Sequence, residues 1–160
     1  MPGTEDENFY RSLFENAAAG IGRTALSDGH VLIANHRLAE IFGYADREEF
    51  IRDFVFAERY AEQDGRERLF EFYDNNPGKL ADASFIRKDG SVVHVEAEVR
   101  LDRARGHIDF VLIDVSERVA AHSELQQHRD DLEQLVDQRT EQLRISEEVF
   151  RTFYEVIQDI

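Results

Sequence analysis

Strict alternation of apolar and polar residues identifies the clearest element of the chain, the segment VVHVEAEVRL at residues 92–101. Successive side chains of a strand point to opposite faces, so this pattern predicts a strand with one buried face. Four further runs have strand character, at residues 21–26, 30–34, 80–87 and 107–115. The pattern therefore predicts five strands.

Short turns join two pairs of these strands. Asp28-Gly29 and Asp89-Gly90 supply the positive φ angles that tight hairpins need, so both pairs should be antiparallel. The last strand is apolar on both faces, which predicts that its second face is also covered. Phe9, Leu13 and Phe14, at helical spacing, are the candidates for that cover.

Helical patterns fill the remainder of residues 1–115. We expect a disordered tail at residues 1–6, an N-terminal helix at 7–20 and a core at 21–115. Within the core, Asn35 should cap a short helix that ends at Gly43, because its side chain can accept free amide hydrogens. Residues 46–76 read as a helical insert in pieces. The fold class is therefore α+β.

A long helix should follow, because neither Gly nor Pro occurs after residue 106. Apolar residues recur at alternating spacings of three and four, which predicts a parallel coiled coil over residues 116–146. The predicted dimer seam consists of Leu125, Leu132, Val136, Leu143 and Phe150. A second register keeps Leu125 and Leu132 but takes His128, Leu135, Gln142 and Val149 in place of the others, so register is weakly specified. We expect a homodimer through this helix and the N-terminal helix; the alternative is a solvated connector.

Residues 147–155 (EEVFRTFYE) resemble residues 7–15 (ENFYRSLFE), with Glu, Arg and Glu at the same places. If this repeat is real, residues 147–160 begin a second copy of the same module. A match of this length also arises by chance, so both interpretations stay open.

Composition limits the function. With 160 residues, the chain has room for one domain and an appendage. The net charge of −15 repels phosphate groups, so we expect neither nucleic acid nor an anionic membrane as a partner. The start lacks the apolar stretch of a signal peptide, and no segment is long and apolar enough to cross a bilayer. We therefore expect a cytoplasmic protein.

Five short motifs in order resemble the PAS sensor family over about residues 7–118. They are LFEN at 13–16, IAN at 33–35, FGY at 42–44, RKDGS at 87–91 and DVSER at 114–118. The resemblance implies a PAS fold, with a five-stranded antiparallel sheet, short helices on one face, an N-terminal helix and a long C-terminal signalling helix. His36 departs from the family, which often has Pro after the Asn.

The DVSER segment resembles the family's Asp-Ile-Thr motif, which couples the sheet to the following helix. Asp114 can cap that helix, Glu117 can complete a capping box, and Arg118 can pair with Asp114. We therefore predict a signal relay made of Asp114, Ser116, Glu117 and Arg118. The alternative is a plain helix cap without a signalling role.

Periodicity directs a set of mainly aromatic residues inward, where they either fill the core or line a pocket. The candidate pocket residues are His36, Phe42, Phe54, Phe70, Phe85, Val95 and Phe110. The ligand is unknown. The chain has no Cys, which excludes a covalently bound flavin or coumaric acid. Haem is not expected, because the segment where related domains carry their haem ligand, residues 59–74, has no His.

Enzyme motifs are absent from the sequence, including a Gly-rich phosphate loop and paired His at metal spacing, so we expect no catalytic activity and no metal. The resemblance implies a sensory and dimerisation module that relays a signal to an output domain outside this chain, such as a bacterial two-component histidine kinase or a cyclic-dinucleotide enzyme. One alternative is a ligand-free structural coupler. Another is a module that docks a protein on the sheet face bearing His94, Glu96, Glu98 and Arg100.

Overall fold

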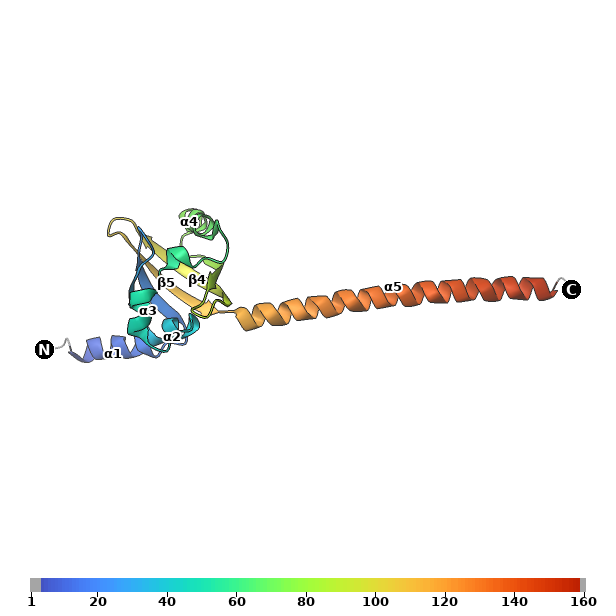
Figure 1. Ribbon diagram of the computed structural model, residues 1–160, viewed down its shortest axis with the longest axis horizontal. Coiled ribbons are helices and arrows are strands. Elements are labelled where there is room, and N and C mark those ends of the chain that lie inside the picture. The colour runs from blue at the N-terminus through green and yellow to red at the C-terminus, as the bar shows by residue number, and fades with distance from the viewer. Residues whose placement is uncertain (1–3, 159–160) are drawn as a thin grey trace. The chain divides into compact units, whose positions relative to one another are not determined.

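The structure, a computed structural model, describes residues 4–158. Its centre is a five-stranded antiparallel sheet in the order β2-β1-β5-β4-β3 (Figure 1). The strands are β1 (Gly20–Ala25), β2 (Val31–Ala34), β3 (Leu80–Ile86), β4 (Val92–Asp102) and β5 (His107–Asp114). All five predicted strands are therefore confirmed, and β5 lies at the centre between β1 and β4.

Short helices cover the inner face of the sheet. They are α2 (His36–Ile41), α3 (Arg47–Asp53), the 3-10 helix η1 (Phe56–Glu58) and α4 (Gly65–Asn75). As predicted, Asn35 caps α2 by accepting a hydrogen bond from the Leu38 amide. The α2 and α3 helices pack on β1 and β2, whereas α4 packs on β3 and β4.

Aromatic rings dominate the core between the helices and the sheet. Phe42 contacts four other rings, with centroid separations from 4.6 to 5.8 Å. These partners come from α3, η1, β3 and the segment after α3, so one cluster joins separate parts of the chain. The four partner rings are Phe50, Phe54, Phe56 and Phe85.

The N-terminal helix differs from the prediction in its bounds. It runs from Thr4 to Glu15, not over residues 7–20, so residues 4–6 of the expected disordered tail are helical. Residues 1–3 of that tail lie outside the described residues. The helix ends early because the side-chain amide of Asn16 donates to the Ser12 carbonyl. The side-chain Nδ2 of Asn35 also donates to the carbonyls of Phe14 and Ala19.

The predicted cover over the outer face of β5 is also wrong. Phe9 and Leu13 of α1 are more than half exposed, and Val111 and Ile113 on the outer face of β5 remain 45% and 44% exposed. Only Phe14 lines a groove on that face. The apolar face of α1 and the outer face of β5 therefore both remain largely exposed.

The long helix α5 runs without a break from Ser116 to Gln158 (Figure 1). It contains the predicted coiled-coil segment 116–146 and continues through residues 147–158; residues 159–160 lie outside the described residues. Continuity of the helix agrees with either interpretation of the 147–155 repeat. Whether residues 147–160 begin a second module stays a prediction.

Candidate functional site

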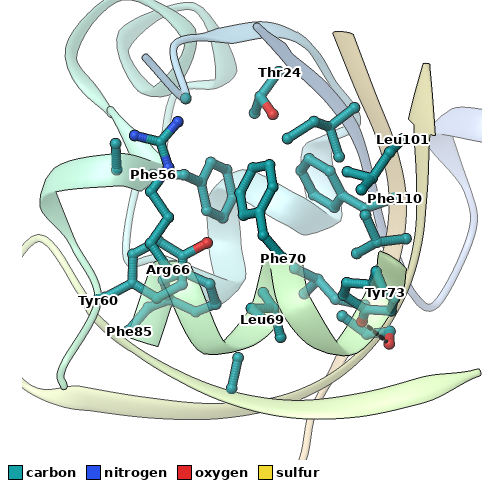
Figure 2. Close-up of a pocket in the computed structure, with 17 residues that line it drawn as sticks. Thr24, Phe56, Tyr60, Arg66, Leu69, Phe70, Tyr73, Phe85, Leu101 and Phe110 are labelled. Carbon is teal, nitrogen blue, oxygen red and sulfur yellow. Dashed lines mark hydrogen bonds between the residues drawn. The ribbon is translucent and has the colours of Figure 1, made fainter. Parts of the chain in front are cut away.

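A cavity of about 60 Å³ lies between α4 and the inner face of the sheet (Figure 2). Strand β5 supplies one wall through Ile108, Phe110 and Leu112, and α4 supplies Leu69 and Phe70 opposite. Phe56, Phe85, Val99 and Leu101 complete much of its apolar wall. Such a concave, mostly apolar site with few polar groups is typical of a small-molecule pocket.

Four polar side chains interrupt this apolar wall. The Tyr73 hydroxyl donates to the Ala97 carbonyl at 2.6 Å, so it is already occupied. The hydroxyls of Thr24 and Tyr60 point toward the cavity (Figure 2), and burial raises the pKa of Tyr60 to about 12. Arg66 is the fourth. The site therefore combines an apolar body with two free hydroxyls and one cation.

Arg66 reaches from α4 to the turn between β1 and β2. Its Nη2 atom donates to the carbonyls of Leu26 and Ser27 at 3.1 and 3.2 Å. Its guanidinium also lies 5.4 Å from the centre of the Phe70 ring, within the range of a cation–π contact. Among the described residues, no carboxylate lies within ion-pair distance of Arg66, in contrast to Arg68 on the same helix, which pairs with Glu62.

The predicted pocket residues divide into three groups. Phe70, Phe85 and Phe110 line the cavity. Phe42, Phe54 and Val95 are fully buried in the core but do not line it. The sequence reasoning missed Thr24, Tyr60 and Arg66. One signal for Thr24 was present, because alternation along β1 places it on the same face as Gly20 and Gly22.

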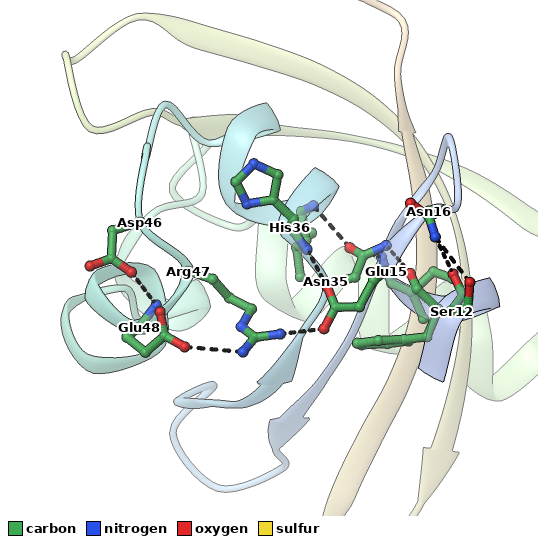
Figure 3. Close-up of polar contacts among 11 residues, drawn as sticks. Ser12, Glu15, Asn16, Asn35, His36, Asp46, Arg47 and Glu48 are labelled. Atoms are coloured by element: carbon green, nitrogen blue, oxygen red, sulfur yellow. Dashed lines mark hydrogen bonds and ion pairs between the residues drawn. The ribbon is translucent and has the colours of Figure 1, made fainter. Parts of the chain in front are cut away.

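His36 lies elsewhere, on an exposed surface of α2. Its ring is 3.3 Å from Glu40, and its own backbone amide donates to Glu15 of α1 at 3.3 Å. Arg47 of α3 also binds Glu15 (Figure 3). His36 therefore does not line the cavity beside α4; it borders a separate surface depression together with Glu15 and Arg47.

The predicted relay segment forms a joint at the end of β5. The Asp114 carboxylate accepts from Arg87 Nη2 at 2.6 Å and from the Ser116 amide at 2.9 Å. The Ser116 hydroxyl accepts in turn from the His94 amide at 3.0 Å. Arg87 Nε donates to the carbonyl of Ile41 at the end of α2. The joint therefore ties the first residue of α5 to β4, β3 and α2.

Of the other two predicted relay residues, Glu117 departs from the expected capping box, and the role of Arg118 stays a prediction. Glu117 is exposed, and in the described part of the chain its side chain makes no capping-box hydrogen bond to the amide of Asp114. The structure assigns Arg87 as the partner of Asp114, a residue that the sequence reasoning did not select. Arg87 directly follows β3, 27 positions before Asp114, and the fold brings the two residues together.

Electrostatics keep the Asp114 carboxylate charged. Burial by itself raises the pKa of Asp114, but the hydrogen bonds from Ser116 and the charge of Arg87 outweigh it and hold the pKa below its ordinary value. The side chains of Asp114 and Arg87 are each 23% exposed. The pair is therefore partly shielded from solvent, where a charge-assisted hydrogen bond is stronger than at the surface.

Along α5, the predicted seam residues are exposed in the single chain. Leu125, Leu132, Val136, Leu143 and Phe150 each expose 60–69% of their surface. Leu135 and Val149, which belong to the alternative register, are exposed as well. Both seams are available for pairing, and dimerisation stays a prediction.

Residues 4–158 contain neither a metal-binding cluster nor a membrane-spanning helix. They include no group of three His, Asp or Glu side chains placed to bind a metal ion. Nor do they include a helix that is long and apolar enough to cross a membrane.

Comparison with known proteins gives structural neighbours only. No protein-family model and no curated protein matches the sequence. Among solved structures, the PAS domain of an HTR-like protein from Haloarcula marismortui is 20% identical, with a TM-score of 0.51 over 69% of this chain and 92% of that one. A sensory box histidine kinase/response regulator from Burkholderia thailandensis E264 is 14% identical, with a TM-score of 0.54 over 78% and 98%.

A third neighbour was solved with a ligand. It is the PAS domain, in complex with ethanol, of a LuxR-family transcriptional regulator from Burkholderia thailandensis. The two sequences are 24% identical, with a TM-score of 0.52 over 67% of this chain and 97% of that domain. At these identities the likeness establishes the fold. The sheet and the helices that cover it form the PAS fold found in domains of sensor histidine kinases, as the five sequence motifs predicted.

Proposed function

We propose that this chain is a non-catalytic sensory module that transmits the state of the cavity to helix α5. The main support for this proposal is that one strand contributes both to the cavity and to the joint at Asp114. Strand β5 lines the cavity through Ile108, Phe110 and Leu112, and it ends at Asp114, two residues before α5 begins. A ligand that displaces this wall would also displace the joint.

The geometry supports a two-state joint. Asp114 holds the start of α5 through one hydrogen bond to the Ser116 amide, and it holds β3 through Arg87. A small shift of β5 would weaken one of these bonds relative to the other. A ligand can shift such an equilibrium only by its difference in affinity for the two states, and the cavity wall provides that difference.

The output of the module would be the pairing of α5 in a homodimer. Two registers with similar apolar content differ in whether Val136 or Leu135 faces the partner. We propose that the joint biases this choice and that the helix passes it to an output domain such as a histidine kinase or a cyclic-dinucleotide enzyme. The neighbours named above, which include a histidine kinase, support this assignment by fold alone.

A second candidate function rests on a different observation. The core beside the cavity is filled by the ring cluster around Phe42, and the cavity itself is small. Both features also suit a ligand-free structural coupler that holds two chains together. The ethanol complex of the Burkholderia thailandensis domain favours sensing, because that PAS domain binds a small molecule.

A ligand-independent experiment tests the sensing proposal. Ala83 lies in the cavity wall on β3, so Ala83→Val adds two methyl groups where a ligand would sit. Ala61→Val, at an exposed position outside the cavity, is the matched control. We expect Ala83→Val to change amide hydrogen exchange at residues 114–120, and Ala61→Val to leave it unaltered. Unchanged exchange in a folded Ala83→Val protein would favour the structural coupler.

A further inference from the structure

Polar side chains of Thr24, Tyr60 and Arg66 interrupt the apolar lining of the cavity. Thr24 is 3% exposed as a residue and lines the cavity, and in the described part of the chain its hydroxyl makes no hydrogen bond to another residue. Tyr60 is partly exposed and also lines the cavity without a side-chain hydrogen bond in the described part of the chain, while the Tyr73 hydroxyl is occupied by the Ala97 carbonyl. Figure 2 shows the Thr24 and Tyr60 side chains at different parts of the cavity lining. The described residues include no fully buried side-chain N or O atom without a hydrogen-bond partner, so both hydroxyls are open to the cavity and available to a ligand.

The charge beside the cavity is positive. Arg66 lines the cavity and uses Nη2 for the carbonyls of Leu26 and Ser27, which leaves its other N–H groups available. It has no carboxylate partner among the described residues, although the chain has 34 acidic residues against 19 basic ones. A guanidinium that is held in place beside a cavity and lacks an anion is suited to bind a carboxylate.

The volume limits the size of the ligand. One water needs about 10–15 Å³ of cavity volume. The cavity of about 60 Å³ therefore accommodates a ligand of roughly four to six non-hydrogen atoms. Phe56, Phe70 and Phe110 surround the space away from the polar side chains, so the rest of the ligand must be apolar.

We infer that the cavity binds a short-chain aliphatic monocarboxylate, with its carboxylate at Arg66, Thr24 and Tyr60 and its alkyl chain among the Phe rings. This inference rests on the proposed sensory function and specifies the ligand class. Arg66 provides the charge, and the Tyr60 phenol, which is protonated at neutral pH, provides a hydrogen-bond donor.

Butyrate and its neutral isostere butyramide test the inference on the intact chain. Binding is followed through amide resonances of residues 66–73 and 108–112 in an NMR titration at pH 7. We expect butyrate to bind about tenfold or more tightly than butyramide, since a hydrogen bond to a charged group exceeds a neutral one by roughly this factor. Equal binding of the two, or no binding of either, would overturn the inference.

Substitutions on α4 test whether Arg66 causes the preference for butyrate over butyramide. Arg66→Gln should remove the preference for butyrate while it keeps a donor for the Leu26 and Ser27 carbonyls, and Arg66→Lys should retain it. Arg68→Gln is the matched control, because Arg68 lies on the same helix, outside the cavity, and pairs with Glu62. A preference that persists in Arg66→Gln would show that Arg66 is not the anion site.

The butyrate titration and the Ala83→Val experiment test the ligand class and the relay separately. The Ala83→Val experiment uses no ligand, so a failure of butyrate to bind would refute the ligand class and leave the relay standing. Conversely, selective binding of butyrate without any change at residues 114–120 would support the ligand class and contradict the relay.

Discussion

Arg87 Nη2 donates a hydrogen bond of 2.6 Å to Asp114 Oδ2 at the end of β5. Arg87 Nε also donates to the carbonyl of Ile41, so the pair links the end of β5 to the end of α2. The two residues are 27 positions apart. Asp114 is the last residue of β5, which lines the cavity, and its carboxylate also accepts a hydrogen bond from the amide of Ser116, the first residue of α5. This arrangement makes Asp114 the residue whose loss should uncouple the two.

The stability contributed by Asp114 should depend on pH. Its pKa in the folded protein lies below the ordinary value of 3.8. A carboxyl of this kind stabilises the fold above its unfolded pKa, and the contribution is lost as the pH falls through the lower, folded value. We expect Asp114→Asn to lower the free energy of unfolding by about 1.5–3 kcal/mol at pH 7.

Below pH 3.8 this difference should shrink as Asp114 in the wild type becomes protonated. Urea denaturation of both proteins at a series of pH values measures it. Asp137→Asn, an exposed position on α5, serves as the control and should have little effect at any pH. A difference that stays constant from pH 7 to the acid limit would show that the charge of Asp114 is irrelevant to stability.

Close packing of α2 on β1 should make Gly22 intolerant of any side chain. A Cβ atom at this position would come within 2.6 Å of Leu38 Cδ2 and 2.7 Å of Phe110 Cζ. Gly22→Ala should therefore destabilise the protein by about 1–3 kcal/mol, as overpacking of a core does. Thermal or urea denaturation measures this. Adding Leu38→Val should recover part of the loss; wild-type stability of Gly22→Ala would disprove the close approach.

Asn35 should anchor α1 and cap α2 through separate atoms. Its Oδ1 atom accepts from the amides of Ile21 and Leu38, and its Nδ2 atom donates to the carbonyls of Phe14 and Ala19. Asn35→Asp keeps the acceptor and loses both donor bonds, so hydrogen exchange should accelerate in α1 while α2 stays protected.

Asn35→Ala removes both functions. It should accelerate exchange in both helices and cost about 1 kcal/mol for the lost cap, with about 1–3 kcal/mol more for buried groups left unsatisfied. If Asp and Ala gave the same exchange pattern, the division between the two atoms would be wrong.

Leu132 should be essential for dimerisation, because it belongs to both registers of α5. Leu132→Glu should weaken the dimer by roughly 3 kcal/mol or more, since one Leu from each chain loses its burial. Gln138→Glu adds the same charge outside both seams and should leave the dimer intact. Sedimentation equilibrium distinguishes the two; a monomeric wild-type chain would support the solvated connector.

Local sequence patterns predicted most of the secondary-structure elements of the fold. Alternation and the Asp-Gly turns gave the strands because strand burial and hairpin geometry depend on neighbours in sequence. The end of α1 was missed because the carbonyls of Phe14 and Ala19 bind Asn35, a distant residue. Tertiary hydrogen bonds of this kind override helix propensity.

The site was predicted less completely for the same reason. Phe70, Phe85 and Phe110 followed from periodicity, which shows the face that a residue occupies. Periodicity does not show which inward residues pack together and which border a space, so Phe42 and Phe54 were included although they fill the core. Arg66 and Arg87 were missed because a charged residue in a helix or a turn normally lies in solvent.

Disulfide cross-linking of α5 tests the central claim, that the cavity sets the state of α5 through Asp114. The chain has no Cys, so Leu135→Cys and Val136→Cys each report one register cleanly. Their cross-linking ratio is measured in the wild type, in Ala83→Val, in Asp114→Asn and in the double variant. The account predicts that Ala83→Val changes the ratio and that Asp114→Asn abolishes this change. An identical ratio in all four proteins would contradict it.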